Sequence, residues 1–423
     1  TNKPTTDEMV NCERYLDREF ELLTGLRVVV ALGKIGGLQG RGVSRLALSD
    51  ADRAGRDQVT AWMRDLGLAV TVDRIGNVLG IRSGEVDGPP VMMGSHIDTV
   101  KAGGIYDGNL GVLAGLEVIA VLNDLGLATK RSLAVGLFTN EEGSQFAPDM
   151  MGSAVHQGFL DLEEVLAVRG IDGAEVGKEL ERIGDAGSEP TGSVRPHCYF
   201  ELHIEQGPVL EQEGILIGAV EGVQGISWTE YLIKGVSNHA GTTPMRMRCD
   251  AGYLAAAIAV EARSIAREMG GDQVATTGLI EFKPNLVNVI PGQALITVDL
   301  RNTDEALLQA AERRLTSFVE QTADAEGLDV SERVLARFEP VSFDPSMVDL
   351  VERVARDRGF TVRRLPSGAG HDAQMFAPNC PTAMIFVPSA GGISHNPAEY
   401  TAPEQIRAGA DVLLRVVLEK AMK

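Results

Sequence analysis

Cysteine is scarce in this 423-residue chain, and long hydrophobic runs are missing. The four cysteines (Cys12, Cys198, Cys249 and Cys380) lie far apart and form no CxxC pair, which argues against a disulfide framework and against a thiolate zinc site. No apolar segment approaches the roughly 20 residues that a membrane-spanning helix needs. Residues 1–20 are polar and lack the apolar stretch of a secretory signal. We therefore expect a soluble, cytoplasmic protein.

Basic residues are also in deficit, with 39 Lys and Arg against 59 Asp and Glu and a formal net charge of -20. An acidic surface repels phosphate backbones and anionic lipid headgroups, so we expect neither nucleic-acid nor membrane binding. Hydrophobic residues make up 44% and charged residues 23%, which is the composition of a globular protein. The length allows two or three domains, and no internal repeat is visible.

From about residue 50 to residue 220, β-rich segments alternate with helix-like segments. Strands are expected at PPVMMGSHIDTV, RSLAVGLFTN and CYFELHIEQG, and GNLGVLAGLEVIAVLNDLG has the spacing of a long helix. The pattern returns after about residue 338, with a helix at MVDLVERVARDRG and a strand at TAMIFVPS. Such alternation predicts an α/β domain with a mostly parallel sheet flanked by helices.

The intervening segment has a different order of elements. A strand is followed by an Ala-rich helix, two strands, a second helix and a closing strand, and this βαββαβ order is the ferredoxin-like signature. We therefore predict one α/β domain (residues 1–222 and 338–423) interrupted by an inserted α+β domain (residues 223–337). Residues 170–197, rich in Gly, Glu and Asp, are expected to form a surface insertion.

Several histidines lie where the expected strands end. His96 and Asp98 are in GSHIDTV, and a spacing of two puts both side chains on one face. His203 is in ELHIEQG, and His395 follows the last strand. Each alone is compatible with a core histidine, and an isolated HxD pair is more often structural. Together they fall at the strand ends where sites assemble in open α/β sheets.

Acidic residues follow the same pattern. Asp107 lies in the loop YDGNLG before a helix, where an Asp taken alone is more often an N-cap. Glu141 and Glu142 end the strand SLAVGLFTN, where adjacent carboxylates indicate either a compensating positive charge or a solvated turn. Imidazole and oxygen donors without cysteine suit zinc, manganese, cobalt or nickel. A paired-metal site would make a bound water acidic enough to attack an amide.

Taken together, the motifs of the chain resemble those of a known family. The order of its motifs is similar to that of the co-catalytic metallopeptidase superfamily of aminoacylases and carboxypeptidases, and in particular its hydantoinase/carbamoylase branch. The motifs are GSHIDTV, YDGNLGVLAGLE, TNEEGSQF, ELHIEQGPVLE, SNHAGTTPM, NVIPG, SGAGHDA and GISHNPAEYT. The resemblance extends from about residue 36, in the segment GGLQGRGVSRLAL, to Thr401.

The branch includes N-carbamoyl-L-amino-acid hydrolases, allantoate amidohydrolases and β-ureidopropionases. The resemblance therefore implies an amidohydrolase that cleaves the carbamoyl C–N bond of a ureido acid and releases ammonia. It also implies two divalent metal ions per subunit, zinc or manganese, with cobalt or nickel as further possibilities. By motif, Asp107 bridges the ions, His96 and His203 complete one set of ligands, and Glu142 and His395 complete the other.

Two further roles come from the same motifs. Glu141 is the implied general base, and Asp98 is expected to steady His96. His203 distinguishes members within the superfamily, because many peptidase members have a carboxylate at the matching position. The HIEQG form is typical of the branch that hydrolyses ureido compounds.

The inserted domain carries candidate substrate-binding residues. His239 in SNHAGTTPM, Asn288 in NVIPG and Arg301 in VDLRN match residues that bind substrate in relatives. Arg301 is suited to a substrate carboxylate, although a surface salt bridge explains it equally well on its own. His239 is suited to stabilising the oxyanion that develops on the scissile carbonyl. In relatives such groups often come from the lid of the second subunit, so a lid and dimerisation role and a homodimer are implied.

Further substrate contacts are expected from two loops of the α/β domain. Gln206, shortly after the HIE motif, is expected to touch the substrate. The loop SGAGHDA is expected to offer backbone groups of Gly368, Ala369 and Gly370, whereas a structural role is equally compatible with His371.

Other enzyme classes leave no motif in the chain. There is no G-x-S-x-G elbow, no G-x-x-x-x-G-K-[ST] loop and no H-E-x-x-H helix. One alternative keeps the fold and the metals but cleaves a peptide or an N-acyl amino acid. Another is a catalytically silent binding protein, which would lack a base or a ligand. The identities of the substrate and of the metal stay open.

Overall fold

The computed structural model describes residues 32–38 and 42–423. Residues 1–31, which the expected first domain includes, and residues 39–41, within GGLQGRG, lie outside the described residues. The chain divides into two compact units. The first unit comprises Thr1–Glu221 with Phe343–Lys423, and the inserted unit comprises Gly222–Ser342. Among the described residues, no helix is both long and apolar enough to cross a membrane.

The first unit is built around a nine-stranded sheet, of which only the edge strand at residues 341–342 and the end of its neighbour belong to the inserted unit. Its hydrogen-bonded order is β1 (Ala69–Val72), β2 (Val78–Arg82), β4 (Leu133–Phe138), β3 (Val91–His96), β5 (Cys198–Ile204), β15 (Thr382–Val387), β6 (Ile217–Val223) and β13 (Val341–Ser342), with β14 (Val362–Ser367) also paired to β6. The four central strands β4, β3, β5 and β15 are parallel. The predicted mostly parallel sheet is confirmed for these central strands, and the strands toward both edges pair antiparallel.

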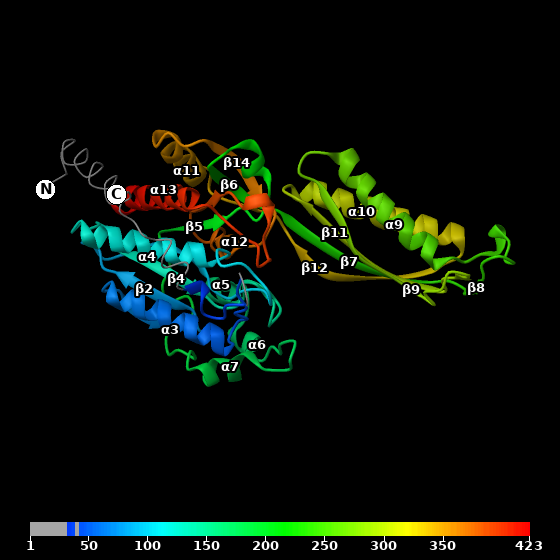
Figure 1. Ribbon diagram of the computed structural model, residues 1–423, viewed down its shortest axis with the longest axis horizontal. Helices are drawn as coiled ribbons and strands as arrows, with labels where there is room; N and C mark the ends of the chain where they lie inside the picture. Colours follow the sequence, from blue (N-terminus) through cyan, green and yellow to red (C-terminus); the bar gives the residue numbers. More distant parts are fainter. Residues whose placement is uncertain (1–31, 39–41) are drawn as a thin grey trace. The chain divides into compact units, whose positions relative to one another are not determined.

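Helices cover both faces of this sheet (Figure 1). On one face lie α4 (Asn109–Asp124), α11 (Pro345–Asp357) and α13 (Pro403–Ala421). On the other lie α5 (Met151–Gln157) and α12 (Asp372–Phe376), whereas α3 (Asp50–Asp65) packs against β1 and β2 on the same face as α4. Because both faces are covered, the four central strands are buried along their whole length, which explains their near-continuous apolar sequences.

The segment between α5 and β5 is more than a surface loop. It contains α6 (Leu162–Leu166) and α7 (Val176–Ile183). Val176, Leu180 and Ile183 are buried in a satellite core together with Phe146 and others. The polar composition of residues 170–197 therefore conceals one apolar helix face that anchors the segment.

The inserted unit has the element order β7 (Gly225–Lys234), α9 (Ala251–Met269), β9 (Val274–Lys283), β11 (Gln293–Asn302), α10 (Glu305–Glu326) and β12 (Asp329–Phe338). Its antiparallel sheet has the order β12-β7-β11-β9, and α9 and α10 pack against one face of it (Figure 1). Alternate residues of β11 are buried, because one side of the strand faces these helices. The short strands β8 (Asn238–His239) and β10 (Val289–Ile290) pair separately.

Candidate metal centre

The carboxyl ends of two adjacent parallel strands bring two predicted ligands together. His96 is the last residue of β3, and His203 is the penultimate residue of β5. The register pairs Met93 with Phe200, so three more residues along each strand bring His96 opposite His203. Their ring centroids are 6.2 Å apart. The sheet register therefore sets the spacing between these two imidazoles.

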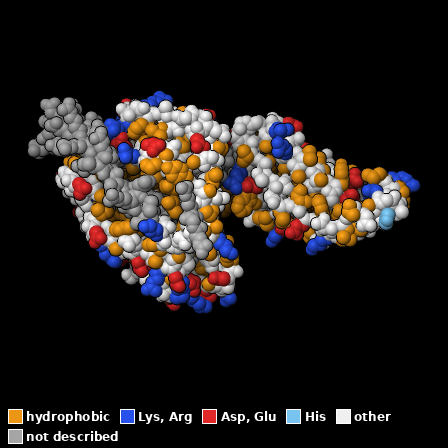
Figure 2. Space-filling view, in the orientation of Figure 1, with side chains coloured by type: hydrophobic (Ala, Val, Ile, Leu, Met, Phe, Trp, Pro, Cys, Tyr) orange, Lys and Arg blue, Asp and Glu red, His pale blue; other side chains and the backbone are white. Residues whose placement is uncertain are grey.

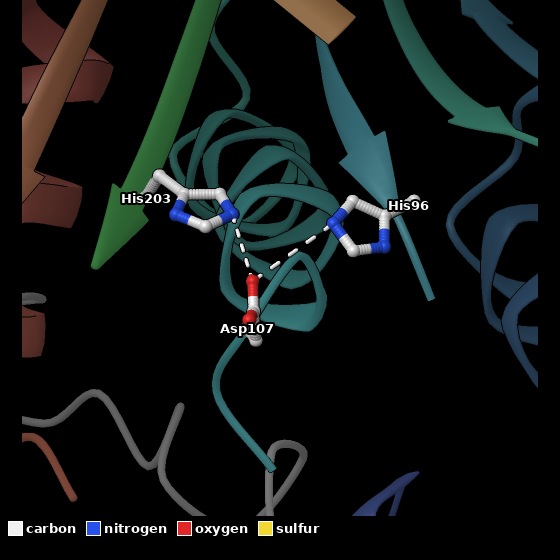
Figure 3. Close-up of side chains that lie close together, drawn as sticks. All are labelled: His96, Asp107 and His203. Atoms are coloured by element: carbon white, nitrogen blue, oxygen red, sulfur yellow. Dashed lines mark ion pairs between the residues drawn. The ribbon is translucent and has the colours of Figure 1, made fainter. Parts of the chain in front are cut away.

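Asp107 reaches this pair from the loop that precedes α4. Its Oδ1 lies 3.2 Å from Nε2 of His203 and 4.0 Å from Nε2 of His96 (Figure 3). Its other oxygen, Oδ2, lies 3.3 Å from Nε2 of His395, and that nitrogen is 3.3 Å from Oε2 of Glu142. The five residues therefore form two groups that share Asp107, each compact enough to hold a metal ion.

The donor set fits a divalent cation. Nδ1 of His96 lies 3.0 Å from the Asp98 carbonyl oxygen, while its buried Nε2 has no hydrogen-bond partner among the described residues. If Nδ1 donates to that carbonyl, the lone pair of Nε2 points toward Asp107. A Cβ at Gly108 would lie 2.3 Å from this nitrogen, so only glycine leaves the space beside it open.

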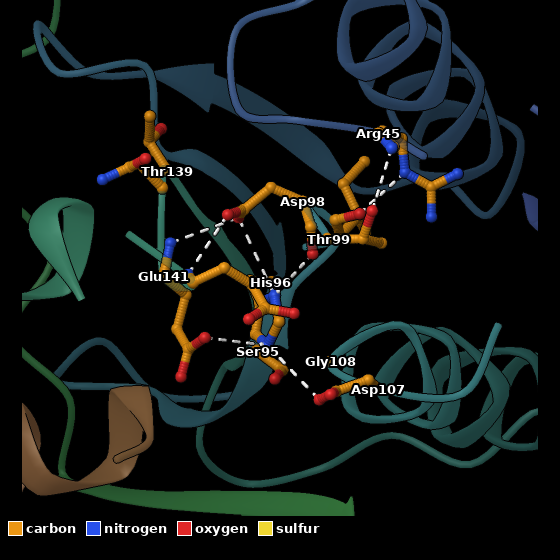
Figure 4. A network of polar contacts seen from close by, with 12 residues as sticks. Arg45, Ser95, His96, Asp98, Thr99, Asp107, Gly108, Thr139 and Glu141 are labelled. Atoms are coloured by element: carbon orange, nitrogen blue, oxygen red, sulfur yellow. Dashed lines mark hydrogen bonds and ion pairs between the residues drawn. The ribbon is translucent and has the colours of Figure 1, made fainter. Parts of the chain in front are cut away.

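Asp98 plays a different part from the one expected. Its Oδ1 lies 3.7 Å from Nδ1 of His96, within ion-pair distance, but the hydrogen bond of that nitrogen, at 3.0 Å, is to the carbonyl of Asp98. The carboxylate instead accepts the backbone N–H groups of Glu141 and Glu142, each at 3.2 Å (Figure 4). The side chain of Asp98 thus fixes the turn that carries the two glutamates.

Glu141 and Glu142 point to different places, as expected for adjacent residues. Oε2 of Glu141 lies 3.2 Å from Nε2 of His96, whereas Glu142 faces His395. The turn is tightly constrained, because Asn140 has a positive φ of 56° and donates its side-chain amide to the Phe146 carbonyl. Glu141 is therefore beside the first ligand group, and Glu142 is part of the second.

Burial dominates the electrostatics of these acids. Burial, reinforced by Asp372 and Glu142, raises the pKa of Glu141 well above its usual range. Burial and Asp107 do the same to the pKa of Glu142, and burial raises the pKa of Asp98 to about 7. So many buried carboxyl groups are costly as anions unless a cation lies among them.

The pKa values of the two strand-end histidines are shifted in opposite directions. Burial lowers the pKa of His96 to about 4, which keeps its imidazole neutral as a ligand must be. Burial also opposes protonation of His203, but its contact with Asp107 outweighs burial and raises the pKa to about 9. Asp107 consequently has its pKa held well below the usual range by His203 and His395, against the effect of its own burial.

Two other side chains hold Asp107. Gln206, which has a φ of 57°, donates its Nε2 to Oδ2 of Asp107 at 2.9 Å. Glu399 is buried, and its Oε1 accepts the backbone N–H groups of Tyr106 and Asp107, each at 3.1 Å. Glu399 was not among the site residues expected from the sequence, although it lies in the motif HNPAEYT only four residues after His395.

A third group whose donor atoms lie close enough together to hold an ion comprises Glu201, His203 and His371. The carboxylate of Glu201 accepts from Ser95 Oγ at 2.7 Å and from the Ala373 N–H at 2.9 Å. Glu201 is thus already hydrogen-bonded, and the ring of His371 lies edge-on against His203, with ring centroids 4.5 Å apart.

His371 also organises the SGAGHDA loop. Its Nε2 is 2.8 Å from Oγ of Ser367, which donates to the carbonyl of Ala369 and accepts that residue's N–H. Gly368 and Gly370 flank Ala369 in this turn. The loop conformation is therefore fixed through a buried histidine.

The candidate substrate residues of the inserted unit lie in two places. His239 is exposed on β8, opposite Val289, and the carbonyl of Asn288 accepts the Ala240 N–H. Arg301 lies near the far end of β11, where Asp299 binds its guanidinium at 2.9 Å and Trp228 lies 5.9 Å beneath it. From Gln293 to Arg301 the strand covers about 26 Å at roughly 3.3 Å per residue.

Comparison with known proteins gives a consistent result. The family model described as peptidase family M20/M25/M40 matches residues 92–419. The N-carbamoyl-L-amino-acid amidohydrolase of Rhizobium meliloti is 41% identical over 99% of this chain and 98% of its own length. The allantoate amidohydrolase of Escherichia coli K12 is 35% identical over 90% of this chain and 93% of its own.

A solved structure agrees with these relatives. The crystal structure of an amidase of the hydantoinase/carbamoylase family from Burkholderia multivorans superposes with a TM-score of 0.92. It is 44% identical and covers 94% of this chain and 97% of its own. The family inferred from the order of the motifs is thereby confirmed, and the chain belongs to peptidase family M20/M25/M40.

Proposed function

We propose that the chain is a metal-dependent amidohydrolase that cleaves the carbamoyl C–N bond of a ureido acid and releases ammonia. Its substrate would be an N-carbamoyl-L-amino acid or a related compound such as allantoate. The observation that carries the proposal is the pair of ligand groups that share Asp107. The names of the relatives, which cover almost the whole chain, support the substrate class.

We assign two divalent ions to this centre. His96, Asp107 and His203 would hold one ion, and Asp107, Glu142 and His395 the other. Imidazole and carboxylate donors accept zinc, manganese, cobalt or nickel. When bound in such a site, these ions make a water molecule acidic enough to attack an amide carbon near neutral pH.

Glu141 is assigned the proton transfers. Its carboxyl group lies beside the first ligand group, and burial raises its pKa well above the usual range, which favours accepting a proton from the attacking water. The same group would then donate that proton to the leaving nitrogen, because an amine leaves far more easily than its anion. Asp98 acts on this step by holding the backbone of Glu141.

The remaining residues are assigned to the substrate. Arg301 would bind its carboxylate, and His239 would donate to the oxyanion on the carbamoyl carbon. Asn288 and Gln206 would add polar contacts, and the turn around Gly368 and Ala369 would add backbone groups. We infer that the inserted unit acts as a lid that excludes water during the reaction.

The separation within the inserted unit favours a homodimer. Gln293, at the end of β11 that follows Asn288 and β10, lies about 26 Å along the strand from Arg301, which exceeds the length of a small ureido acid. One inserted unit therefore cannot supply both ends of a single site, whereas two subunits can. Exposed apolar side chains of the loops around His239 are available to contact a partner. They are Val236, Met245, Met247, Leu286 and Val287, on a unit whose surface shows many apolar side chains in Figure 2.

The test is a substrate panel assayed for ammonia and amine release. Purified protein is stripped with a chelator and reconstituted separately with manganese and with zinc. We expect no turnover after chelation, recovery with at least one metal, and hydrolysis of N-carbamoyl-L-amino acids, N-carbamoyl-β-alanine, ureidoglycolate or allantoate. Turnover of dipeptides or N-acetyl amino acids without turnover of any ureido acid would contradict the proposal.

A further inference from the structure

Arg45 is a fully buried cation that the proposed chemistry does not use. Its guanidinium donates to four oxygens: Nε to the Ile97 carbonyl at 2.7 Å, Nη2 to Oδ1 of Asn109 at 2.6 Å, and Nη1 to the carbonyls of Leu32 and Ile35 at 3.0 and 2.9 Å. No carboxylate of residues 32–38 or 42–423 forms an ion pair with it. Burying such a charge is expensive, so its position calls for a reason.

Two of the four oxygens that Arg45 binds belong to the segments that carry His96 and Asp107 of the first ligand group. Ile97 directly follows His96 at the end of β3. Asn109, the first residue of α4, donates its Nδ2 to the carbonyl of Asp107 at 3.1 Å. The same guanidinium therefore connects the strand end that carries one ligand with the helix start that carries the other.

The backbone of Arg45 strengthens this connection. Its N–H donates to Oγ1 of Thr99 at 2.9 Å, and its carbonyl accepts the Thr99 N–H at 2.9 Å (Figure 4). Val43 and Gly103 exchange a second pair of backbone hydrogen bonds, each within 3.0 Å. The whole loop between His96 and Asp107 is thus bound at its start and toward its end by residues 43–45.

We propose that Arg45 is a positioning residue of the metal centre, which holds His96 and Asp107 at the separation that the first ion requires. This inference rests on the ligand assignment made above. A planar guanidinium can reach four oxygens on three segments at once, whereas an ammonium group is a compact point charge and cannot. Side chains that orient metal ligands in this way typically change metal affinity about 10- to 100-fold when replaced.

Loss of the charge of Arg45 and loss of its hydrogen bonds are expected to change metal affinity in opposite directions, and the choice of variant separates the two effects. A nearby positive charge repels a dication, so removing the charge alone would strengthen metal binding. Arg45→Lys keeps the charge but loses the planar set of hydrogen-bond donors, and it therefore reports on the positioning of His96 and Asp107. The matched control is Arg415→Lys, since Arg415 is also mostly buried but pairs with Asp411 on α13.

The experiment titrates folded, metal-free protein with Mn²⁺ and follows the free ion by electron paramagnetic resonance. Thermal unfolding of the metal-free proteins is measured separately, so that loss of stability is not mistaken for loss of affinity. We expect Arg45→Lys to bind at least one Mn²⁺ about 10- to 100-fold more weakly than the unsubstituted chain. Arg415→Lys is expected to keep the original affinity even if it is less stable.

A folded Arg45→Lys variant with unchanged affinity for both ions would overturn the inference. If that variant does not fold, Asn109→Ala decides, because it removes the connection from Arg45 to Asp107 and should weaken Mn²⁺ binding in the same way. An Asn109→Ala variant with full affinity would also overturn the inference. Failure of the unsubstituted chain to bind any divalent ion would instead overturn the proposed function.

Discussion

Gly108 lies at the start of α4 against the imidazole of His96, and replacing it with alanine tests the ligand geometry directly. A Cβ at this position would be 2.3 Å from Nε2, 2.4 Å from Cε1 and 2.5 Å from Cδ2 of that ring. Ordinary contact begins at 3.4 Å, so the ring and the backbone must separate by about 1 Å. The imidazole has little room to yield, because it is buried and hydrogen-bonded through Nδ1.

Gly126 provides a matched control at the other end of the same helix. Both glycines have a positive φ, 63° for Gly108 and 61° for Gly126, so alanine brings backbone strain of about 1 kcal/mol at Gly126. The strain at Gly108 is larger, because its ψ of -48° lies outside the left-handed helical region. A Cβ at Gly126 meets no atom within 4 Å. Comparison of the two variants therefore separates the cost of a positive φ from the collision with His96 and the additional strain at Gly108.

We expect Gly108→Ala to lower kcat/KM by at least about 100-fold, because a 1 Å misplacement of a reacting group can have that effect. The variant should also hold less metal at equal metal concentration. Gly126→Ala should change kcat/KM little and lose about 1 kcal/mol in the free energy of unfolding. Ammonia-release kinetics, metal analysis and denaturant unfolding measure these effects. If Gly108→Ala retained two ions and the activity of Gly126→Ala, the deduced contact with His96 would be wrong.

Two further predictions separate roles that lie close together. Glu141→Gln should retain both ions and near-normal substrate binding while kcat falls at least about 100-fold. Glu142→Gln should instead bind one ion more weakly and regain part of its activity at high metal concentration. Metal analysis showing the opposite pattern would exchange the two roles. Arg301→Lys keeps the charge but loses the bidentate fork, so KM for carboxylate-bearing substrates should rise far more than kcat falls, and an unchanged KM would mean that Arg301 does not anchor the substrate.

The sequence was sufficient to predict that several site residues lie close together. The expected strands place His96, His203 and the glutamates at the carboxyl ends of a parallel sheet, along one edge. The pairing of ligands into two sets came from the resemblance to a family, since no spacing along the chain reports which carboxylate oxygen faces which imidazole. In the structure, His96 and His203 lie near one oxygen of Asp107, and Glu142 and His395 form a second group with it.

Other features were beyond the reach of sequence reasoning. Asp98 was expected to orient His96 through its carboxylate, but its backbone carbonyl does so, and an HxD spacing cannot distinguish these two oxygens. The connection from Arg45 to Asn109 spans 64 residues and depends on how the chain folds back. The antiparallel edges of the large sheet likewise depend on long-range pairing that local periodicity does not report.

The distance along β11 between the two groups of substrate residues has a consequence for genetics and for mixing experiments. If each site takes His239 from one chain and Glu141 from the other, a chain with a substitution at one of these residues still supplies the other residue intact. Random reassortment of His239→Ala and Glu141→Gln chains makes half of the dimers mixed, each with one complete site, so two nearly inactive proteins would together regain about a quarter of the full activity. Recovery would require exchange of subunits, and no recovery after proven exchange would place both residues of each site in one chain.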